Sequence, residues 1–183
     1  YKRQAFMAEG YSRETGKLGV CCATTGPGAT NLLTGVASAF ADNIPMLVIT
    51  AQTPLPKFGR NALQESSCTA IDTVGIFRHC TRYNTLVSHT EQLSAKLISA
   101  IMAAFRVPAG PSHISIPSDI LRAPASTNQL TQADKLVHDF ALTDNAAVHK
   151  LIDMLKESQR VALFLGKGCG PAIEPIMEFA ELT

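Results

Sequence analysis

The sequence lacks the features that would assign it directly to several large classes of protein. No apolar run approaches the roughly 18 residues that a membrane-spanning helix needs, so we expect no membrane partner. Internal repeats and low-complexity tracts are absent too. No run of Lys and Arg is present and the formal net charge is only +1, so nothing in the sequence attracts a polyanion. We therefore expect no nucleic-acid partner.

The cysteines lack the spacing of a metal site or a redox pair. Their number is odd, no two of them form a C-x-x-C pair, and two adjacent ones lie within an apolar stretch. We interpret all of them as reduced thiols without a metal-binding or catalytic role. Because the first residues also show no secretory signal, we expect a cytoplasmic protein. The five are Cys21, Cys22, Cys68, Cys80 and Cys169.

The sequence does contain enough apolar material for a core, since 46% of the residues are hydrophobic and 17% are charged. Helical spacing predicts helices over 3–15, ending at Gly16, over 29–41, over 69–77, and over 93–105 after a Ser88–Glu91 capping box. Short apolar runs predict strands over 17–24, 46–51, 81–87 and 112–117. This alternation predicts the α/β class, with a parallel sheet covered by helices on both faces.

The composition changes after residue 122. Residues 1–122 form the predicted sheet domain, and 123–142, with few apolar anchors, are expected to be an inter-domain linker. Residues 143–183 are expected to begin a second α/β domain, with a helix over 144–157, a strand over 160–165, a glycine turn and a helix with Pro171 near its start. Both ends of the chain fall within expected helices, which indicates a piece of a longer protein.

A turn built as Gly26-Pro27-Gly28 joins an apolar strand to a helix. A dinucleotide fingerprint would need a third glycine, where Asn31 stands, and an acidic residue about 20 residues further on. A P-loop would need Lys-Ser or Lys-Thr after the last glycine, and neither is present. The remaining alternatives are a ligand approached by the bare backbone, or a tight turn with no ligand at all.

Several motifs around this turn occur together, in order: "EGYSRETGKLGVCCATTGPGATN", "ALQE", "TRYN" and "GPSHISIPSD". From about Phe6 to Ile120 the chain resembles the pyrimidine-binding domain of thiamine diphosphate enzymes, and most of all the large catalytic subunit of acetolactate synthase. The resemblance implies a carboligase that decarboxylates a 2-keto acid, pyruvate, and joins the product to a second 2-keto acid. It also implies a homodimer or homotetramer for the full-length protein, with a small regulatory subunit as a further partner, and an inactive fragment here.

The resemblance assigns cofactor-binding roles around the turn. Gly26, Pro27 and Gly28 would form the backbone wall of the thiamine diphosphate pyrimidine pocket, and Asn31 would face it. Alternatively, Asn31 satisfies free backbone N–H groups at the start of the helix. The diphosphate and its Mg²⁺ would lie on another domain, whose GDG…N motif is absent here, so no residue of this chain is expected to bind metal.

The segment "NALQESS" supplies the candidate substrate end of the site. Gln64 matches a glutamine of the family and is the candidate catalytic residue, whereas Leu63 stands where the family usually has Phe and would line the substrate pocket. Alternatively, Gln64 is a polar loop residue in water. Arg82 stands where the family often has Lys, or it is a solvated surface charge.

A second glycine turn, Gly166 to Gly170, would open the central domain of the family. In acetolactate synthases that domain binds FAD near this turn, which makes Gly166 and Gly168 candidate FAD-binding residues. Many relatives keep a similar turn without FAD.

The glutamate on which the chemistry of the family relies is expected nine residues before Gly10, where Tyr1 stands. Either the first strand of the domain, which carries this acid, lies upstream of this fragment and the first residues are poorly placed, or the protein lacks the acid. Glu9 matches a different acidic residue of the motif. Glyoxylate carboligases work without that glutamate, so they remain an alternative, as do pyruvate oxidases and 2-keto acid decarboxylases. A non-catalytic, dimer-forming or regulatory paralogue is an alternative of another class.

Overall fold

The computed structural model describes residues 1–124, 144–158 and 160–182. Contacts divide the chain into two compact units, Tyr1–His138 and Asp139–Thr183, which are described separately. Most of the linker expected at 123–142 lies outside the described residues. The domain boundaries inferred from composition therefore stay predictions.

The first unit is built on a four-stranded sheet of β1 (Gly19–Ala23), β2 (Met46–Gln52), β3 (Tyr83–Leu86) and β4 (Pro111–Pro117). The strand order is β1-β2-β4-β3, and all three pairs are parallel. The predicted parallel sheet of the α/β class is thereby confirmed.

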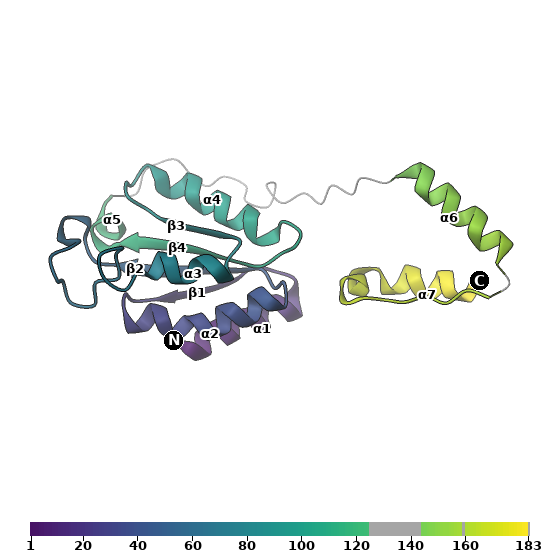
Figure 1. Cartoon of the computed structure of the whole chain (residues 1–183), viewed down its shortest axis with the longest axis horizontal. Helices are drawn as coiled ribbons and strands as arrows, with labels where there is room; N and C mark the ends of the chain where they lie inside the picture. Colours follow the sequence, from purple (N-terminus) through teal and green to yellow (C-terminus); the bar gives the residue numbers. More distant parts are fainter. Residues whose placement is uncertain (125–143, 159, 183) are drawn as a thin grey trace. The chain divides into compact units, whose positions relative to one another are not determined.

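Helices cover both faces of this sheet (Figure 1). One face packs against α1 (Lys2–Thr15) and α2 (Pro27–Ala41), and the other against α4 (Gln92–Phe105). Strand β2 divides its side chains between two cores, since Met46 and Val48 belong to the first and Leu47 to the second. The shorter helices of the unit are η1 (Leu55–Lys57), α3 (Thr73–Phe77), η2 (Arg78–Cys80) and α5 (Ser118–Arg122).

Three helix starts differ from the expectation. Helix α2 begins at Pro27 rather than residue 29, because proline fits the first helical position, where its missing N–H is not needed. The Ser88–Glu91 capping box is wrong: the Gln92 side chain instead accepts hydrogen bonds from the Ser88 backbone N–H at 3.2 Å and hydroxyl at 3.1 Å. The helix expected over 69–77 contracts to α3, where the Asp72 side chain caps the Gly75 N–H.

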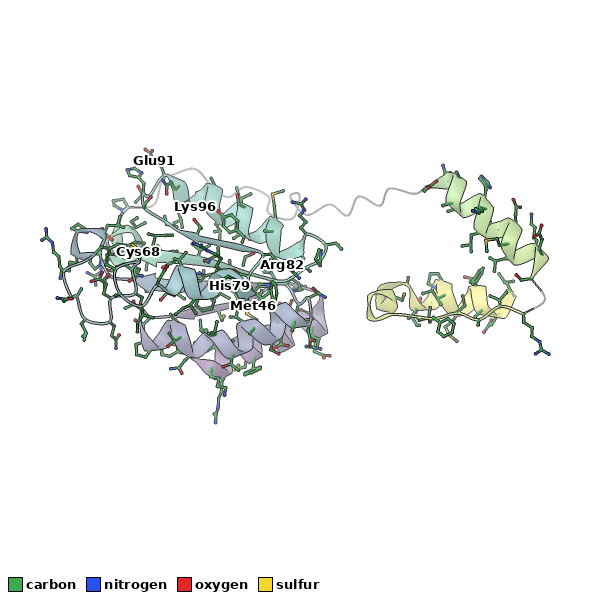
Figure 2. All side chains as sticks on the ribbon, viewed as in Figure 1. Met46, Cys68, His79, Arg82, Glu91 and Lys96 are labelled. Atoms are coloured by element: carbon green, nitrogen blue, oxygen red, sulfur yellow. The ribbon has the colours of Figure 1, made fainter. Side chains whose placement is uncertain are left out.

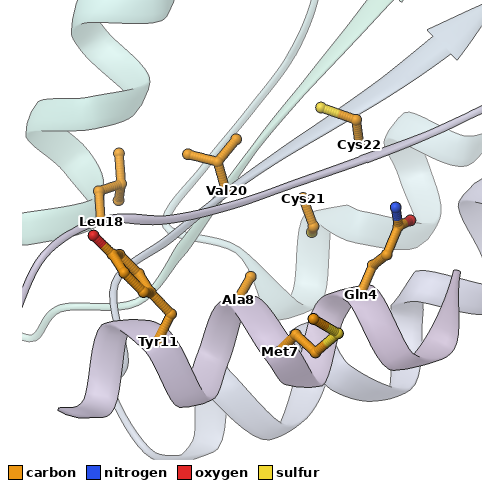
Figure 3. Close-up of a pocket in the computed structure, with 8 residues that line it drawn as sticks. All are labelled: Gln4, Met7, Ala8, Tyr11, Leu18, Val20, Cys21 and Cys22. Atoms are coloured by element: carbon orange, nitrogen blue, oxygen red, sulfur yellow. The ribbon is translucent and has the colours of Figure 1, made fainter. Parts of the chain in front are cut away.

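Strand β1 lies at an edge of the sheet, and α4 does not cover it. Its residues alternate strictly, so Cys21 is buried while Val20 is 53% exposed and Cys22 is also exposed. A groove of about 560 Å³ runs between β1 and α1 (Figure 3), lined by Gln4, Met7, Ala8, Tyr11, Leu18, Val20, Cys21 and Cys22.

The second unit contains α6 (Asn145–Glu157), η4 (Lys167–Ala172) and α7 (Ile173–Leu182). The helix expected over 144–157 is present, and the Asp144 side chain caps it by accepting from the N–H groups of Ala146 and Ala147. The strand expected over 160–165 is wrong, because none of those residues pairs with a neighbouring strand in the described part of the chain. An extended segment without a hydrogen-bonding partner is not a strand. No described helix is long and apolar enough to cross a membrane.

Candidate functional site

The candidate site lies at the carboxyl edge of the sheet. Because the strands are parallel, the turn after β1 and the loop after β2 leave the sheet at the same edge. The structure brings the two segments into contact: a Cβ added to Gly26 would lie 2.8 Å from the Cβ of Gln64. Two residues singled out separately from the sequence are therefore neighbours.

Hydrogen bonds fix this contact. The Thr25 hydroxyl lies 2.8 Å from the Gln64 carbonyl oxygen, to which it donates. The Gly26 backbone N–H donates to the Ser66 hydroxyl at 2.9 Å, and that hydroxyl reaches the same Gln64 carbonyl at 3.1 Å. Two hydroxyl groups thus connect the turn to the backbone of the loop.

The backbone is strained on both sides of the contact. Gly26 has a φ of 63° and a ψ of −122°, a combination that favours glycine strongly. Gln64 has a φ of 56°, which costs a residue with a side chain about 1–3 kcal/mol. Strain of this kind persists only where surrounding contacts hold it, and the hydrogen bonds to the Gln64 carbonyl do so here.

The other predicted residues of this region are solvent-exposed. Pro27 and Asn31 lie exposed on the first turns of α2, and Leu63 is 87% exposed next to Gln64. The Asn31 side chain forms no hydrogen bond with the described residues, so the alternative role in satisfying backbone N–H groups is not observed. Tyr1 lies beside the turn, since its Cε2 would be 3.6 Å from a Cβ placed on Gly28. These exposed groups leave one side of the turn open for a ligand.

Glu65 anchors the loop that carries Gln64. Its carboxylate is largely buried and accepts hydrogen bonds from the Ser67 hydroxyl, from the Gly59 N–H at 2.7 Å and from the Thr69 hydroxyl at 2.9 Å. These bonds favour the ionised form and lower the pKa of Glu65 to about 2. A polar cavity of about 440 Å³ adjoins it, lined by Gly59, Asn61, Ala62, Gln64, Glu65, Thr69 and Ala70.

Sequence reasoning missed a buried histidine in the sheet. His113 on β4 is fully buried and stacks on Phe77, with 4.4 Å between the ring centroids. The Asn84 side-chain nitrogen donates to the Val74 carbonyl, which turns its oxygen toward His113 Nδ1 at 2.7 Å. His113 Nδ1 must therefore donate, and Nε2 accepts from the Thr50 hydroxyl at 2.8 Å. Burial lowers the pKa of His113 to about 3, so this neutral ring is part of the core.

Gln52, the last residue of β2, was missed too. It is 2% exposed, and its Oε1 accepts hydrogen bonds from the N–H groups of Thr53 at 2.9 Å and Ser66 at 3.1 Å. The signal that could have found it is a polar residue ending a continuous apolar strand at the carboxyl edge of the sheet. Such a residue is buried only where it has partners.

Arg82 is exposed, as expected of a surface charge, and it lies away from the candidate site. It precedes β3, so it belongs to the amino edge of the sheet; Figure 2 shows it at the opposite end of the unit from Cys68 in the loop after β2. The guanidinium lies 4.2 Å from the centroid of the Phe40 ring and donates to Asn43 at 2.8 Å and to the Ala109 carbonyl at 3.2 Å. The Arg82 side chain therefore packs on Phe40 while it remains exposed.

The groove beside β1 in Figure 3 has less to offer chemically. Its lining contains no acid, histidine or basic side chain. Burial raises the pKa of the Cys21 thiol to about 12, which keeps that group protonated and unreactive. The turn and the loop after β2 therefore remain the candidate site.

The second glycine turn shows no preformed cradle. A Cβ added to Gly166 or Gly168 would meet no atom within 4 Å, so nothing packs close to that backbone in the described part of the chain. Among the described residues, no group of three His, Cys, Asp or Glu side chains could hold a metal ion either.

Comparison with known proteins matches part of the chain to one described family. Residues 2–73, which contain the turn and Gln64, match the family described as thiamine pyrophosphate enzyme, N-terminal TPP binding domain. These residues are similar to that family; thiamine pyrophosphate is another name for thiamine diphosphate.

Almost the whole chain is also similar to acetolactate synthases. It is 38% identical over 172 residues to the mitochondrial acetolactate synthase catalytic subunit of Saccharomyces cerevisiae, which covers 88% of this chain and 24% of the relative. It is 37% identical over 181 residues to the acetolactate synthase isozyme 2 large subunit of Escherichia coli, covering 98% and 32%. Chloroplastic acetolactate synthase 2 of Nicotiana tabacum is 33% identical over 190 residues, covering 97% and 26%. The chain thus spans about a quarter to a third of these relatives.

Proposed function

We propose that the chain is the pyrimidine-binding part of a thiamine diphosphate-dependent carboligase of the acetolactate synthase type. The observation that carries the proposal is the contact between Gly26 and Gln64. It joins the two segments that the resemblance assigns to the cofactor and to the substrate, although 38 positions of sequence separate them. The identity to acetolactate synthases supports the choice of reaction within the family.

The described residues fit the pyrimidine end of the cofactor. Pro27 is exposed and has no N–H, and the buried glycines on either side of it have no Cβ atoms, so a flat ring would meet few protruding groups at Pro27. Gln64 supplies a side-chain amide beside it, and Leu63 an exposed apolar side chain. When bound, thiamine diphosphate supplies the electron sink for the loss of CO₂ from a 2-keto acid. The role of this chain would be to orient the pyrimidine and to shape the space in which the keto acid lies.

The remaining expectations stay part of the proposal. Mg²⁺ would be bound outside this chain, and FAD near Gly166 and Gly168 would need groups that the described residues do not supply. Association of two or more copies and a regulatory subunit are expected from the resemblance alone. The expected cytoplasmic location stays a prediction as well, since two of the relatives named above are mitochondrial or chloroplastic.

The test combines binding with product analysis. The full-length protein that contains this chain is titrated calorimetrically with thiamine diphosphate in the presence of Mg²⁺, and incubations with pyruvate are assayed for acetolactate. Gly28→Val should abolish binding with an unchanged far-UV circular dichroism spectrum, because its Cβ would lie 2.6 Å from Thr24 Cγ2, which forces Thr24 or the turn to shift locally. Gly10→Ala, at a helical position with no atom within 4 Å of the Cβ, is the control. A folded Gly28→Val protein that binds like the wild type would contradict the proposal.

A second candidate function rests on Tyr1. It stands at the position that the resemblance gives to the glutamate, and it lies next to Gly28. Tyrosine supplies a phenol hydroxyl at this position in place of the carboxylate. A glyoxylate carboligase would form a ligation product from glyoxylate and none from pyruvate, and a non-catalytic paralogue would form neither. The same incubations, repeated with glyoxylate, separate the three.

A further inference from the structure

The inference concerns Gln52, and it rests on the proposed function for its meaning in catalysis. Gln52 ends the central strand β2 and is almost fully buried at the carboxyl edge of the sheet. Its Oε1 accepts from two backbone N–H groups, one of Thr53 and one of Ser66, 14 positions further along the chain. Both donors are N–H groups, so the orientation of the side-chain amide is fixed. The Gln52 Nε2 forms no hydrogen bond with any described residue.

Ser66 transmits this anchoring to the turn. While its N–H is held by Gln52, its hydroxyl accepts from the Gly26 N–H at 2.9 Å. Gly26 is buried and stands at the N-cap of α2, where a backbone N–H has no partner within the helix, and the Ser66 hydroxyl satisfies it. The turn is therefore fixed to β2 through a chain of two hydrogen bonds.

Thr25 transmits the same anchoring to Gln64. Its hydroxyl has one hydrogen and three acceptors within reach: the Gln64 carbonyl at 2.8 Å, Ser66 Oγ at 3.0 Å and Gln52 Oε1 at 3.3 Å. The shortest contact is the one to Gln64, whose backbone has the unfavourable positive φ. Releasing the loop from Gln52 would remove the contacts that hold this conformation.

We propose that Gln52 is a positioning residue of the site, which holds the Gly26–Gly28 turn and Gln64 in a fixed relation. It touches neither the exposed face of the turn nor the exposed Gln64 side chain, so it acts through Ser66 and Thr25. Its distinguishing property is an acceptor oxygen at the end of β2, and the proposal predicts that this oxygen is the group that matters.

The test compares three variants. Gln52→Leu removes the acceptor oxygen at similar volume, and Gln52→Glu keeps an acceptor oxygen. The control, Gln4→Leu, makes the same change from glutamine to leucine at an exposed position in α1, where the side chain forms no hydrogen bond with the described residues. Amide hydrogen exchange is measured by NMR at Ser66 and Gly26, beside far-UV circular dichroism. Gln52→Leu should exchange at both amides roughly tenfold faster, whereas Gln52→Glu and Gln4→Leu should stay within about threefold of the wild type. Unchanged exchange in a folded Gln52→Leu protein would overturn the proposal.

Ser66→Ala decides the matter if Gln52→Leu does not fold. It removes only the hydroxyl, so the Gly26 amide should exchange roughly tenfold faster while the Ser66 amide stays protected. If the Gly26 amide exchanges at the same rate in Ser66→Ala and in the wild type, the proposed connection from Gln52 through Ser66 to Gly26 is refuted.

Calorimetry and kinetics then extend the test to function. Gln52→Leu should weaken thiamine diphosphate binding about tenfold or more and lower kcat for the keto acid, and Gln52→Glu should restore both. If the wild type binds no thiamine diphosphate, the proposed function fails, and hydrogen exchange still tests the role of Gln52 in the geometry. If the wild type binds it and Gln52→Leu binds equally well, the positioning role fails alone.

Discussion

Replacing Gly26 by alanine tests whether the turn has the geometry described. The residue has a positive φ and a ψ of −122°, a conformation that costs an L-residue with a side chain about 1–3 kcal/mol. The new methyl group would also stand 2.8 Å from the Gln64 Cβ, which belongs to the stem of that side chain and moves only with the backbone. Overpacking of this kind costs about 1–3 kcal/mol more. We expect the free energy of unfolding to fall by about 2–5 kcal/mol.

Urea denaturation followed by far-UV circular dichroism measures this change. Gly10→Ala is the matched control, because Gly10 lies inside α1, has no positive φ, and leaves open space where the Cβ would stand. The control should gain about 0.5–1 kcal/mol, since alanine restricts the unfolded chain more than glycine. If Gly26→Ala denatures within about 0.5 kcal/mol of the wild type, the backbone conformation and the contact with Gln64 are both refuted.

Three further predictions concern neighbouring residues. The pKa of Glu65 is lowered to about 2, so this carboxylate stabilises the fold above its unfolded pKa near 4.5, and the stabilisation disappears as the pH falls toward 2. The urea midpoint should therefore drop less steeply between pH 5 and 2 in Glu65→Gln than in the wild type. Parallel plots of urea midpoint against pH for the two proteins would contradict this. The pKa of His113 is also lowered, from 6.5 to about 3, so the neutral ring contributes fully to stability above pH 6.5, and this contribution decreases as the pH falls toward 3. His113→Phe should remove this part of the pH dependence of the urea midpoint. An unchanged slope of urea midpoint against pH would count against a neutral buried ring. Leu63→Phe should leave the unfolding midpoint unchanged, because Leu63 is 87% exposed, and should shift keto-acid discrimination by about 1–3 kcal/mol; unchanged product ratios in a competition assay would remove Leu63 from the substrate pocket.

The sheet could be predicted from the sequence because its signal is strong and local. Continuous apolar runs such as 46–51 are typical of strands buried on both faces, and the helices between them show regular apolar spacing. Strand and helix boundaries shifted by two to three residues where local chemistry competed, as at Pro27 and Ser88. The prediction of a strand over 160–165 was wrong for a physical reason. Apolar composition favours a strand, but the backbone N–H and C=O groups of a strand also need hydrogen-bonding partners.

The candidate site could be predicted only in part. Gly26 and Gln64 came from motifs, and the structure shows that they are in contact. Gln52, Ser66 and Thr25 could not be assigned, since hydrogen bonds between segments 14 to 41 positions apart leave no periodic signal in one sequence. The contacts of Arg82 could not be predicted for the same reason, because its partners Phe40 and Asn43 lie on a distant helix and turn.

The two edges of the sheet divide the tasks of this protein between them. At the carboxyl edge, exposed side chains stand on a backbone that hydrogen bonds from Gln52, Ser66 and Thr25 hold in place. At the amino edge, Arg82 packs on Phe40 and donates a hydrogen bond to Asn43. In evolution, substitutions that change ligand preference and substitutions that destabilise the fold would then fall at different positions of the sequence. Under the proposed function, we expect substitutions at Leu63 to change ligand preference with little loss of folded protein, and substitutions at Arg82, which remove its contacts with Phe40 and Asn43, to leave ligand preference unchanged.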